Sequence, residues 1–404
     1  MTDHQSPSLL LLPPPPHPAS RAALKAAFEP PLRATISRLK DEATGEAQVL
    51  IASIASPALK SVSSRQKALC WSDAQSILAG VYSIVSVICA QLAIPTDIHA
   101  GPGSVDVRVI LVDHDLSKPQ VADLKPALEP NNTVVVDLAT FACAYHPWRY
   151  VFHASNEPGC QLLATYLKTS ESVQTLKQDQ IIAVQGGLSL TAESAVVTQP
   201  SVQPKTFPVV CLGGTFDHLH PGHKLLLTAA VLLLDVPERT ASEPCRFIIG
   251  VTGDELLKRK KYADLVQSWD ERASNIIEFL SSMLQLSKHG WDGRRTSTFV
   301  KKDDEIIARF RDDTIEIQCV VIQDAYGPTI TAENMDALVV SGETRSGGKA
   351  VNERRAELGW RLLEIFEVDV LDAEDIVDSP TKTQDFATKI SSTAIRQKKA
   401  ESRI

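Results

Sequence analysis

The chain has 404 residues, of which 44% are hydrophobic and 22% are charged, and its formal net charge at pH 7 is -8. That length is enough for two domains with full-sized cores. The acidic balance makes general binding to nucleic acid or to an anionic membrane a poor fit, so any anion site must be local. Seven scattered cysteines without a CxxC pair indicate buried thiols in a reducing compartment, neither a disulfide framework nor a zinc site.

The N-terminal stretch MTDHQSPSLLLLPPPPHP contains four leucines, but no basic residue precedes them and four prolines follow at once. The stretch is therefore unlike a signal peptide, and we expect residues 1–20 to form a disordered, proline-rich leader. Polar residues interrupt every long apolar run, so we expect no transmembrane helix. We expect a cytoplasmic location, with the nucleus as an additional one.

Residues 21–190 have the pattern of an α/β domain. Residues 71–93 form a long apolar stretch that predicts a buried helix, with Ser72 as its N-cap. β-branched runs of strand length occur at 48–55, 105–113 and 132–141. The sequence of this half contains no phosphate loop, metal cluster or nucleophile arrangement, and it assigns this half no role.

Residues 191–206 are rich in Thr, Ser, Gln and Pro, which predicts a linker between two domains. Charged residues also rise from 31 in residues 1–200 to 59 in residues 201–404. Beyond the linker, alternating strands and helices predict a doubly wound parallel sheet, with the basic stretch 288–311 as an irregular surface insertion. The expected elements are strands at 208–212, 245–253, 315–322, 337–342 and 361–371 and helices at 222–234, 270–288, 349–358 and from Ser392.

The stretch GGTFDHLHPGHKLLL lies where the first of these strands gives way to a helix. Gly213 and Gly214 allow backbone N–H groups to approach a phosphate, and the helix N-terminus adds its positive dipole end. His220 and His223 are spaced i, i+3 around Gly222, so both imidazoles can face a phosphate. The alternative is a pair of surface or capping histidines, and zinc binding is a weaker one because no further ligands are near.

A second polar segment, KISSTAIRQKK, lies near the C-terminus. Ser391, Ser392 and Thr393 fall at an expected helix start, and Arg396 follows one turn later. Hydroxyl groups, open N–H groups and an arginine together suit a polyphosphate. An ordinary Ser/Thr cap on a basic helix is the alternative.

Five segments in this order resemble a known family: GGTFDHLHPGHK, GVTGDELLKRKKYADLVQSW, DAYGPT, VVSGETRSGGKAVNERR and KISSTAIR. They resemble eukaryotic phosphopantetheine adenylyltransferases of the HxGH nucleotidyltransferase superfamily, in the fungal, single-activity form, because no kinase P-loop is present. The resemblance covers residues 205–400 and implies a Rossmann-like nucleotidyltransferase domain over 207–404. It also implies AMP transfer from ATP to 4′-phosphopantetheine, by in-line attack of the acceptor phosphate on the α-phosphorus, with dephospho-CoA and pyrophosphate as products.

The same resemblance implies roles for single residues. Thr215 would contact the acceptor phosphate, His223 would stabilise the α-phosphate, and His220 would contact the ATP phosphates. Lys260 or Lys261 would bind the acceptor phosphate, although a solvated charge run at 258–261 remains the alternative. The other residues implied in ATP binding are Gly213, Gly214, Phe216, Gly222, Gly342, Arg345, Ser391, Ser392, Thr393 and Arg396, and Asp217 is expected to brace the turn.

ATP implies Mg²⁺, which we expect to be carried mainly by phosphates and water because the sequence shows no carboxylate cluster. Other superfamily acceptors remain open, namely nicotinamide mononucleotide and phosphocholine-type substrates. A scaffold for other coenzyme A pathway enzymes is the alternative from a different class. We expect no nucleic-acid or membrane partner, and we expect residues 201–404 to keep measurable activity alone.

Overall fold

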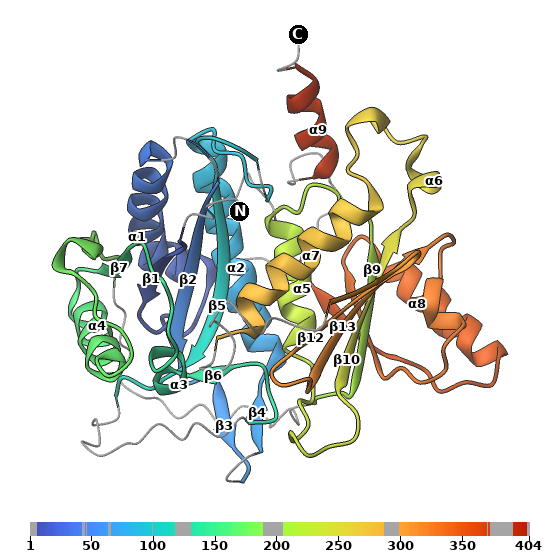
Figure 1. Cartoon of the computed structure of the whole chain (residues 1–404), viewed down its shortest axis with the longest axis horizontal. Helices are drawn as coiled ribbons and strands as arrows, with labels where there is room; N and C mark the ends of the chain where they lie inside the picture. Colours follow the sequence, from blue (N-terminus) through green and yellow to red (C-terminus); the bar gives the residue numbers. More distant parts are fainter. Residues whose placement is uncertain are drawn as a thin grey trace.

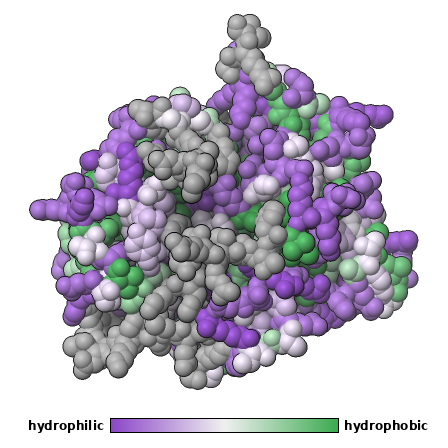
Figure 2. All heavy atoms as spheres, viewed as in Figure 1, coloured by the Kyte–Doolittle hydropathy of each residue, from purple (hydrophilic) through white to green (hydrophobic). Residues whose placement is uncertain are grey.

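The computed structural model describes residues 6–42, 45, 47–63, 66–98, 100–117, 131–188, 205–286, 299–369, 371 and 391–401. Two α/β units lie side by side, each built on one large sheet (Figure 1). Most coloured atoms of the face seen in Figure 2 belong to hydrophilic residues, and hydrophobic residues appear there in small patches.

The N-terminal unit is a parallel sheet in the order β6-β5-β2-β1-β7-β8, with helices packed on it. Its strands are β1 (Ser8–Leu12), β2 (Gln48–Ser56), β5 (Val105–Asp113), β6 (Val136–Asp137), β7 (Val151–Ala154) and β8 (Ile181–Val184). Its helices are α1 (Arg21–Glu42), α2 (Trp71–Gln91), α3 (Leu138–Ala142) and α4 (Glu157–Ser170). A small hairpin, β3 (Leu59–Ser61) and β4 (Lys67–Leu69), and the 3₁₀ turn η1 (Gln178–Gln180) complete it.

The expected disordered leader is wrong from Ser8 onward. The four leucines at 9–12 form β1, pair with β2 and β7, and are each 0% exposed. A central parallel strand is covered on both faces, and a continuous apolar run is the sequence that suits it. The apolar run therefore belongs to the core of the N-terminal unit.

Two local expectations in this unit are also wrong. The N-cap of α2 is Cys70, not Ser72, and it makes no side-chain capping hydrogen bond. The strand expected over 132–141 is only two residues long, because the Asp137 side chain accepts from the Thr140 N–H and starts α3. The strands at 48–55 and 105–113 and the helix at 71–93 are confirmed, with shifts of one or two residues at their ends.

The C-terminal unit is a seven-stranded sheet in the order β11-β12-β13-β10-β9-β14-β15. Its strands are β9 (Val209–Gly214), β10 (Cys245–Thr252), β11 (Phe299–Lys302), β12 (Glu305–Phe310), β13 (Ile315–Ile322), β14 (Ala337–Ser341) and β15 (Glu364–Val368). Its helices are α5 (Pro221–Val231), α6 (Asp254–Leu257), α7 (Trp269–Leu284), α8 (Arg345–Glu357) and α9 (Ser392–Glu401), with 3₁₀ turns η2 (Ala263–Leu265) and η3 (Gly327–Ile330). The five strands β13-β10-β9-β14-β15 are parallel, which confirms the doubly wound sheet.

The stretch 288–311 differs from the expected irregular insertion. From 299 onward it forms β11 and β12, which extend the sheet edge in antiparallel order. The side chains of Ile306, Ala308 and Phe310 are buried at alternate positions, the period of a strand with one covered face. Between them, Ile307 is half-buried and Arg309 is exposed, and the charged residues around this strand hide the alternation in the composition.

The two units share one strand order. In each, the first strand is central, the next two long strands lie on one side and the last two on the other: β5-β2-β1-β7-β8 and β13-β10-β9-β14-β15. Counted in chain order, the first, second and fourth of these strands are followed by helices in both units. These strands are β1, β2 and β7 in the N-terminal unit and β9, β10 and β14 in the C-terminal unit. The N-terminal unit therefore repeats the topology of the C-terminal one.

The units are joined by a common apolar core and by direct hydrogen bonds. Helix α2 packs between α1 and α5, and the Trp71 indole donates to the Ala229 carbonyl at 2.8 Å. The Arg311 guanidinium donates to the Thr133 carbonyl at 3.0 Å and to the Val134 carbonyl at 2.5 Å. By length and composition α2 could cross a membrane, but it is mostly buried inside the molecule, as core helices are. Most of the expected linker, 191–204, lies outside the described residues.

Candidate active site

A cavity of about 740 Å³ opens at the carboxyl ends of β9, β10 and β14. This is the edge of a doubly wound sheet where ligands bind, and the volume is within the range of small-molecule sites. The expected motif segments after β9 and at the start of α9 both line it. Described residues of the N-terminal unit do not line it.

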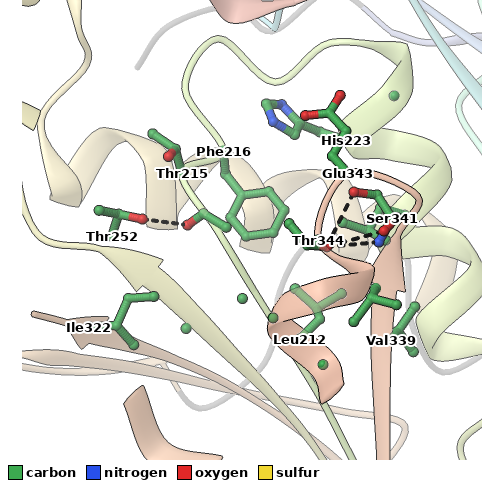
Figure 3. Close-up of a pocket in the computed structure, with 18 of the residues that line it drawn as sticks. Leu212, Thr215, Phe216, His223, Thr252, Ile322, Val339, Ser341, Glu343 and Thr344 are labelled. Carbon is green, nitrogen blue, oxygen red and sulfur yellow. Dashed lines mark hydrogen bonds between the residues drawn. The ribbon is translucent and has the colours of Figure 1, made fainter. Parts of the chain in front are cut away.

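At the end of β9, the absence of a side chain at Gly214 leaves space for the Phe216 ring. A Cβ atom at Gly214 would lie 3.0 Å from the Phe216 ring, whereas one at Gly213 would have no neighbour closer than 3.9 Å. Phe216 itself has a positive φ of 53° and is fully buried, with its ring centroid 5.3 Å from that of His223. Phe216 is thus a packing support beneath His223 (Figure 3). It lines the cavity with Gly213 and Gly214.

His220 and His223 come together as a stacked pair. Their ring centroids are 3.8 Å apart with planes at 24°, and His220 is the N-cap residue of α5. A Cβ atom at Gly222 would approach the His220 ring to 3.2 Å, so the glycine makes room for that ring. Both histidines line the cavity, as the motif spacing predicts.

His223 is neutral at physiological pH. Burial, together with the neighbouring His218, lowers the pKa of His223 to about 3. Its Nδ1 atom is buried and makes no hydrogen bond with any described residue. A neutral imidazole with an open ring nitrogen can exchange a hydrogen bond with a bound oxygen without carrying a charge of its own.

Asp217 braces the motif turn, as expected. Its side chain is 0% exposed, accepts the Gln267 N–H at 3.0 Å and forms an ion pair with Arg396. Its backbone carbonyl accepts the Ser392 hydroxyl at 2.7 Å. Asp217 therefore joins the turn after β9 to the start of α9.

Arg396 lines the cavity, as expected for a phosphate ligand, and its guanidinium also contacts other parts of the protein. Its guanidinium is buried and donates to Asp217, to the Lys261 carbonyl at 3.1 Å and to the Thr393 hydroxyl at 3.1 Å. These contacts hold α9 in place and engage one N–H group on each guanidinium nitrogen, which leaves a second N–H group on Nη1 and on Nη2. Ser391 accepts the Ala394 N–H at 3.3 Å, which is a capping contact, and it lines the cavity with Ser392 and Thr393.

Arg272 connects the turn after β9 to the end of β10. The Arg272 guanidinium is fully buried and donates to the carbonyls of Thr215 at 2.7 Å and Thr252 at 2.8 Å. It also donates to the Asp254 carboxylate at 2.6 Å. The Thr252 hydroxyl donates to the Gly214 carbonyl at 3.2 Å (Figure 3). The side chain of Thr215 is left to line the cavity.

The lysine run separates into different environments. Lys260 lines the cavity, whereas Lys261 does not and places its ammonium 5.3 Å from the Tyr262 ring centroid. Lys258 pairs with Glu255 at 2.6 Å on the surface. Of the two candidates for the acceptor phosphate, the structure brings only Lys260 to the site.

The turn between β14 and α8 does not supply the expected arginine. Arg345 forms a two-pronged ion pair with Glu367 of β15 and does not line the cavity. Gly342 lies in the turn but is also not among the lining residues. Ser341, Glu343 and Thr344 line the cavity instead, and the Thr344 hydroxyl accepts the Ser341 N–H at 3.1 Å (Figure 3).

The chain matches two family models and several named proteins. Residues 211–398 match the family model described as cytidylyltransferase-like, and residues 1–190 match a domain of unknown function (DUF8446). A phosphopantetheine adenylyltransferase of Pyrococcus horikoshii is 31% identical over 193 residues, which are 48% of this chain and 90% of that protein. The chain belongs to the phosphopantetheine adenylyltransferase family.

Two fungal proteins are also similar to about half of this chain. The phosphopantetheine adenylyltransferase of Saccharomyces cerevisiae is 31% identical over 47% of this chain and 48% of its own length. An uncharacterized protein of Schizosaccharomyces pombe is 34% identical over 48% of each chain. The match thus spans about half the length of these two curated relatives.

Sequence reasoning assigned no site role to three polar residues, of which two lie inside the quoted motif segments. Thr252, Asp324 and Asp369 line the cavity from the ends of three strands. It also missed the pattern of buried arginines: Arg355, like Arg272, is 0% exposed, and it donates to the carbonyls of Thr329 and Glu333 beside the cavity. The arginines lie in charged stretches, where composition alone indicates a surface.

Proposed function

We propose that this chain transfers AMP from ATP to 4′-phosphopantetheine. The observation that carries the proposal is the stacked pair His220 and His223 at the start of α5, in a cavity that the Ser391–Thr393 segment also lines. Membership of the family supports the choice of acceptor, because relatives that match along 89% or 90% of their length bear the name phosphopantetheine adenylyltransferase.

The reaction needs no covalent enzyme intermediate. An oxygen of the acceptor phosphate forms a bond to the α-phosphorus of ATP, and the bond from that phosphorus to the bridging oxygen of pyrophosphate breaks. The acceptor oxygen is already ionised, so the enzyme acts by positioning and by stabilising charge. A neutral His223 with an open ring nitrogen suits hydrogen bonding to an α-phosphate oxygen, and Lys260 suits the acceptor phosphate as a point charge.

The β- and γ-phosphates would rest on the start of α9. The N–H groups at its N-terminus and the hydroxyls of Ser391 and Thr393 would donate hydrogen bonds to the phosphate oxygens. Arg345 pairs with Glu367 and does not line the cavity, so it is not included among the phosphate ligands. Arg396 lines the cavity next to its ion pair with Asp217, and it joins the hydroxyl and backbone groups as a phosphate ligand.

Mg²⁺ would enter with ATP. Within the described residues no three His, Cys, Asp or Glu side chains are grouped as a metal site. Three carboxylates line the cavity from separate elements: Asp324, Glu343 and Asp369. Such single carboxylates suit an ion that keeps most of its ligands from phosphate and water. When bound, the ion would neutralise charge on the pyrophosphate leaving group.

The test is pyrophosphate release by the purified chain with Mg²⁺. Three reactions contain ATP with 4′-phosphopantetheine, ATP with nicotinamide mononucleotide, and CTP with phosphocholine. Release only in the first supports the proposal. Release only in another overturns the acceptor, and release in none overturns the transferase activity and favours a scaffold.

A further inference from the structure

We propose that Asp97 and Asp106, two buried residues of the N-terminal unit, are positioning residues for the nucleotide site in the C-terminal unit. Asp106 acts on the start of α5 through Lys224, and Asp97 acts on α9 through Lys399 and on the motif turn through His218. This inference rests on the proposed function, because it concerns the placement of the same two motif segments. It gives a role to the half of the chain that otherwise matches a domain of unknown function.

The first contact lies one residue beyond His223. Lys224 is 1% exposed, and its ammonium pairs with the Asp106 carboxylate of β5 and lies 3.4 Å from the Thr96 and Val107 carbonyls. A buried ammonium requires such partners, because leaving it unpaired costs several kcal/mol. The position of α5 at the histidine pair is therefore tied to the N-terminal sheet.

Asp106 is itself held in a wider network. Its carboxylate accepts two bonds from the Arg108 guanidinium, at 2.6 and 2.9 Å, and Arg108 also pairs with Glu278 of α7 at 3.0 Å. The neighbouring cations hold the pKa of Asp106 well below its usual range, although burial opposes this shift. The carboxylate stays ionised and joins strand β5 to two helices of the C-terminal unit.

The second contact joins three segments at one carboxylate. Asp97 is 3% exposed and pairs with Lys399 at 2.7 Å and with His218 Nδ1 at 3.4 Å. The Lys399 ammonium also lies 3.1 Å from His218 Nδ1, while His218 Nε2 lies 3.0 Å from the Leu265 carbonyl. The N-terminal unit, the turn after β9 and helix α9 therefore meet at Asp97.

Lys399 and Arg396 fix α9 at two successive turns. Arg396 holds the helix to Asp217, and Lys399, three residues later, holds it to Asp97. A helix anchored at one point can pivot, whereas two anchors on one face fix its direction. Ser391, at the other end, is eight residues or roughly 12 Å away, so a small tilt at Lys399 displaces the hydroxyls that line the cavity.

The N-terminal unit has no comparable ligand loop of its own. Where β9 ends in two glycines and is followed by TFDHLHPGH, the equivalent strand β1 is followed by PPPPHP, and proline has no N–H group for a phosphate. None of its described residues lines the cavity. Its effect on the site must therefore pass through contacts such as those of Asp97 and Asp106.

The experiment compares Lys399→Met with Lys398→Met in the full chain. Lys398 is the exposed neighbour on α9 and serves as the matched control. Lys399→Met should raise KM for ATP about tenfold, leave KM for 4′-phosphopantetheine unchanged, and speed hydrogen exchange of the 391–401 amides. Lys398→Met should change none of these values, and Lys399→Arg should restore most of the lost affinity.

A double-mutant cycle connects the effect to the N-terminal unit. Asp97→Asn, which keeps the shape and removes the charge, should reproduce the kinetic change of Lys399→Met, and the double variant should be no worse than either single one. Additive effects, or a loss of stability with unchanged KM values, would overturn the proposal. If the wild-type chain releases no pyrophosphate, the proposed function fails, while hydrogen exchange of α9 still tests the coupling to Asp97 by itself.

Discussion

The His220 and His223 rings stack with their centroids 3.8 Å apart, at the point where β9 gives way to α5. Two imidazolium ions at that distance would repel each other, and burial of His223 already disfavours its charged form. His223 therefore offers a hydrogen bond to a phosphate and little positive charge. Lys260 is the cation of the lysine run that lines the same cavity.

We expect His223→Ala to lower the turnover of AMP transfer by about 10²–10³, the usual effect of removing one transition-state hydrogen bond. The fold should remain intact, because the substitution leaves the buried Lys224 pairing and the α5 core unchanged. Pyrophosphate release and circular dichroism measure the two effects. Activity within a few-fold of the wild type would show that His223 is not at the reacting phosphate.

The free energy of unfolding should fall as the pH drops from 7.5 to 5. Burial lowers the pKa of His146 to about 4, so the unfolded chain binds a proton between pH 6.5 and 4 that the folded chain does not. Stability from this group is complete above pH 6.5 and is lost toward pH 4. The loss at pH 5 is about 2 kcal/mol for His146.

The variant that tests this is His146→Gln, measured by urea unfolding at both pH values. It should reduce the difference in unfolding free energy between pH 7.5 and pH 5. His17→Gln, at an exposed position, is the matched control and should leave the difference unchanged. An equal pH dependence in His146→Gln and the wild type would contradict the assignment.

Gly214→Ala should destabilise the protein by about 1–3 kcal/mol, as overpacking does. The new methyl group would lie 3.0 Å from the Phe216 ring, which is fully buried against His223. Gly213→Ala is the comparison, since its nearest neighbours lie 3.9 Å away. Thermal unfolding of both variants measures the difference, and equal midpoints would show that the turn is not tightly packed.

Arg396→Met should lower the unfolding free energy by roughly 3–5 kcal/mol, because it leaves the buried Asp217 carboxylate without its cation. Arg396→Lys should recover little of this loss, since one ammonium cannot reach Asp217, the Lys261 carbonyl and Thr393 together. Chemical denaturation measures both. A stable Arg396→Met variant that had only lost ATP affinity would show that the ion pair with Asp217 contributes little to stability.

The isolated fragment 205–404 should fail to fold into a stable domain, contrary to what the sequence led us to expect. Removing residues 1–204 strips α2 from α5 and leaves Lys224 without Asp106. An exposed apolar helix face and an unpaired ammonium both disfavour the native state. Limited proteolysis and one-dimensional NMR of the fragment test this, and a folded, active fragment would contradict it.

Motif spacing and hydrophobic period by themselves determined much of this protein. The HxGH and ISST segments and the alternating strands and helices of residues 208–371 follow from local order along the chain, whereas the choice of Lys260 over Lys261 did not. A doubly wound sheet brings the ends of its strands to one edge, so residues that follow those strands meet without any further information.

Only the tertiary structure decided which charged groups reach the ligand. Arg396 and Arg345 look alike in the sequence, yet one is buried against Asp217 and the other pairs with Glu367 at the surface. The same holds for Ser8–Leu12. Its apolar run becomes a central strand because β2 pairs with one of its edges and β7 with the other. Pairing and burial depend on contacts between segments that are 22 residues apart for Arg345 and Glu367 and 302 residues apart for Asp97 and Lys399, and neither separation along the chain predicts the ion pair.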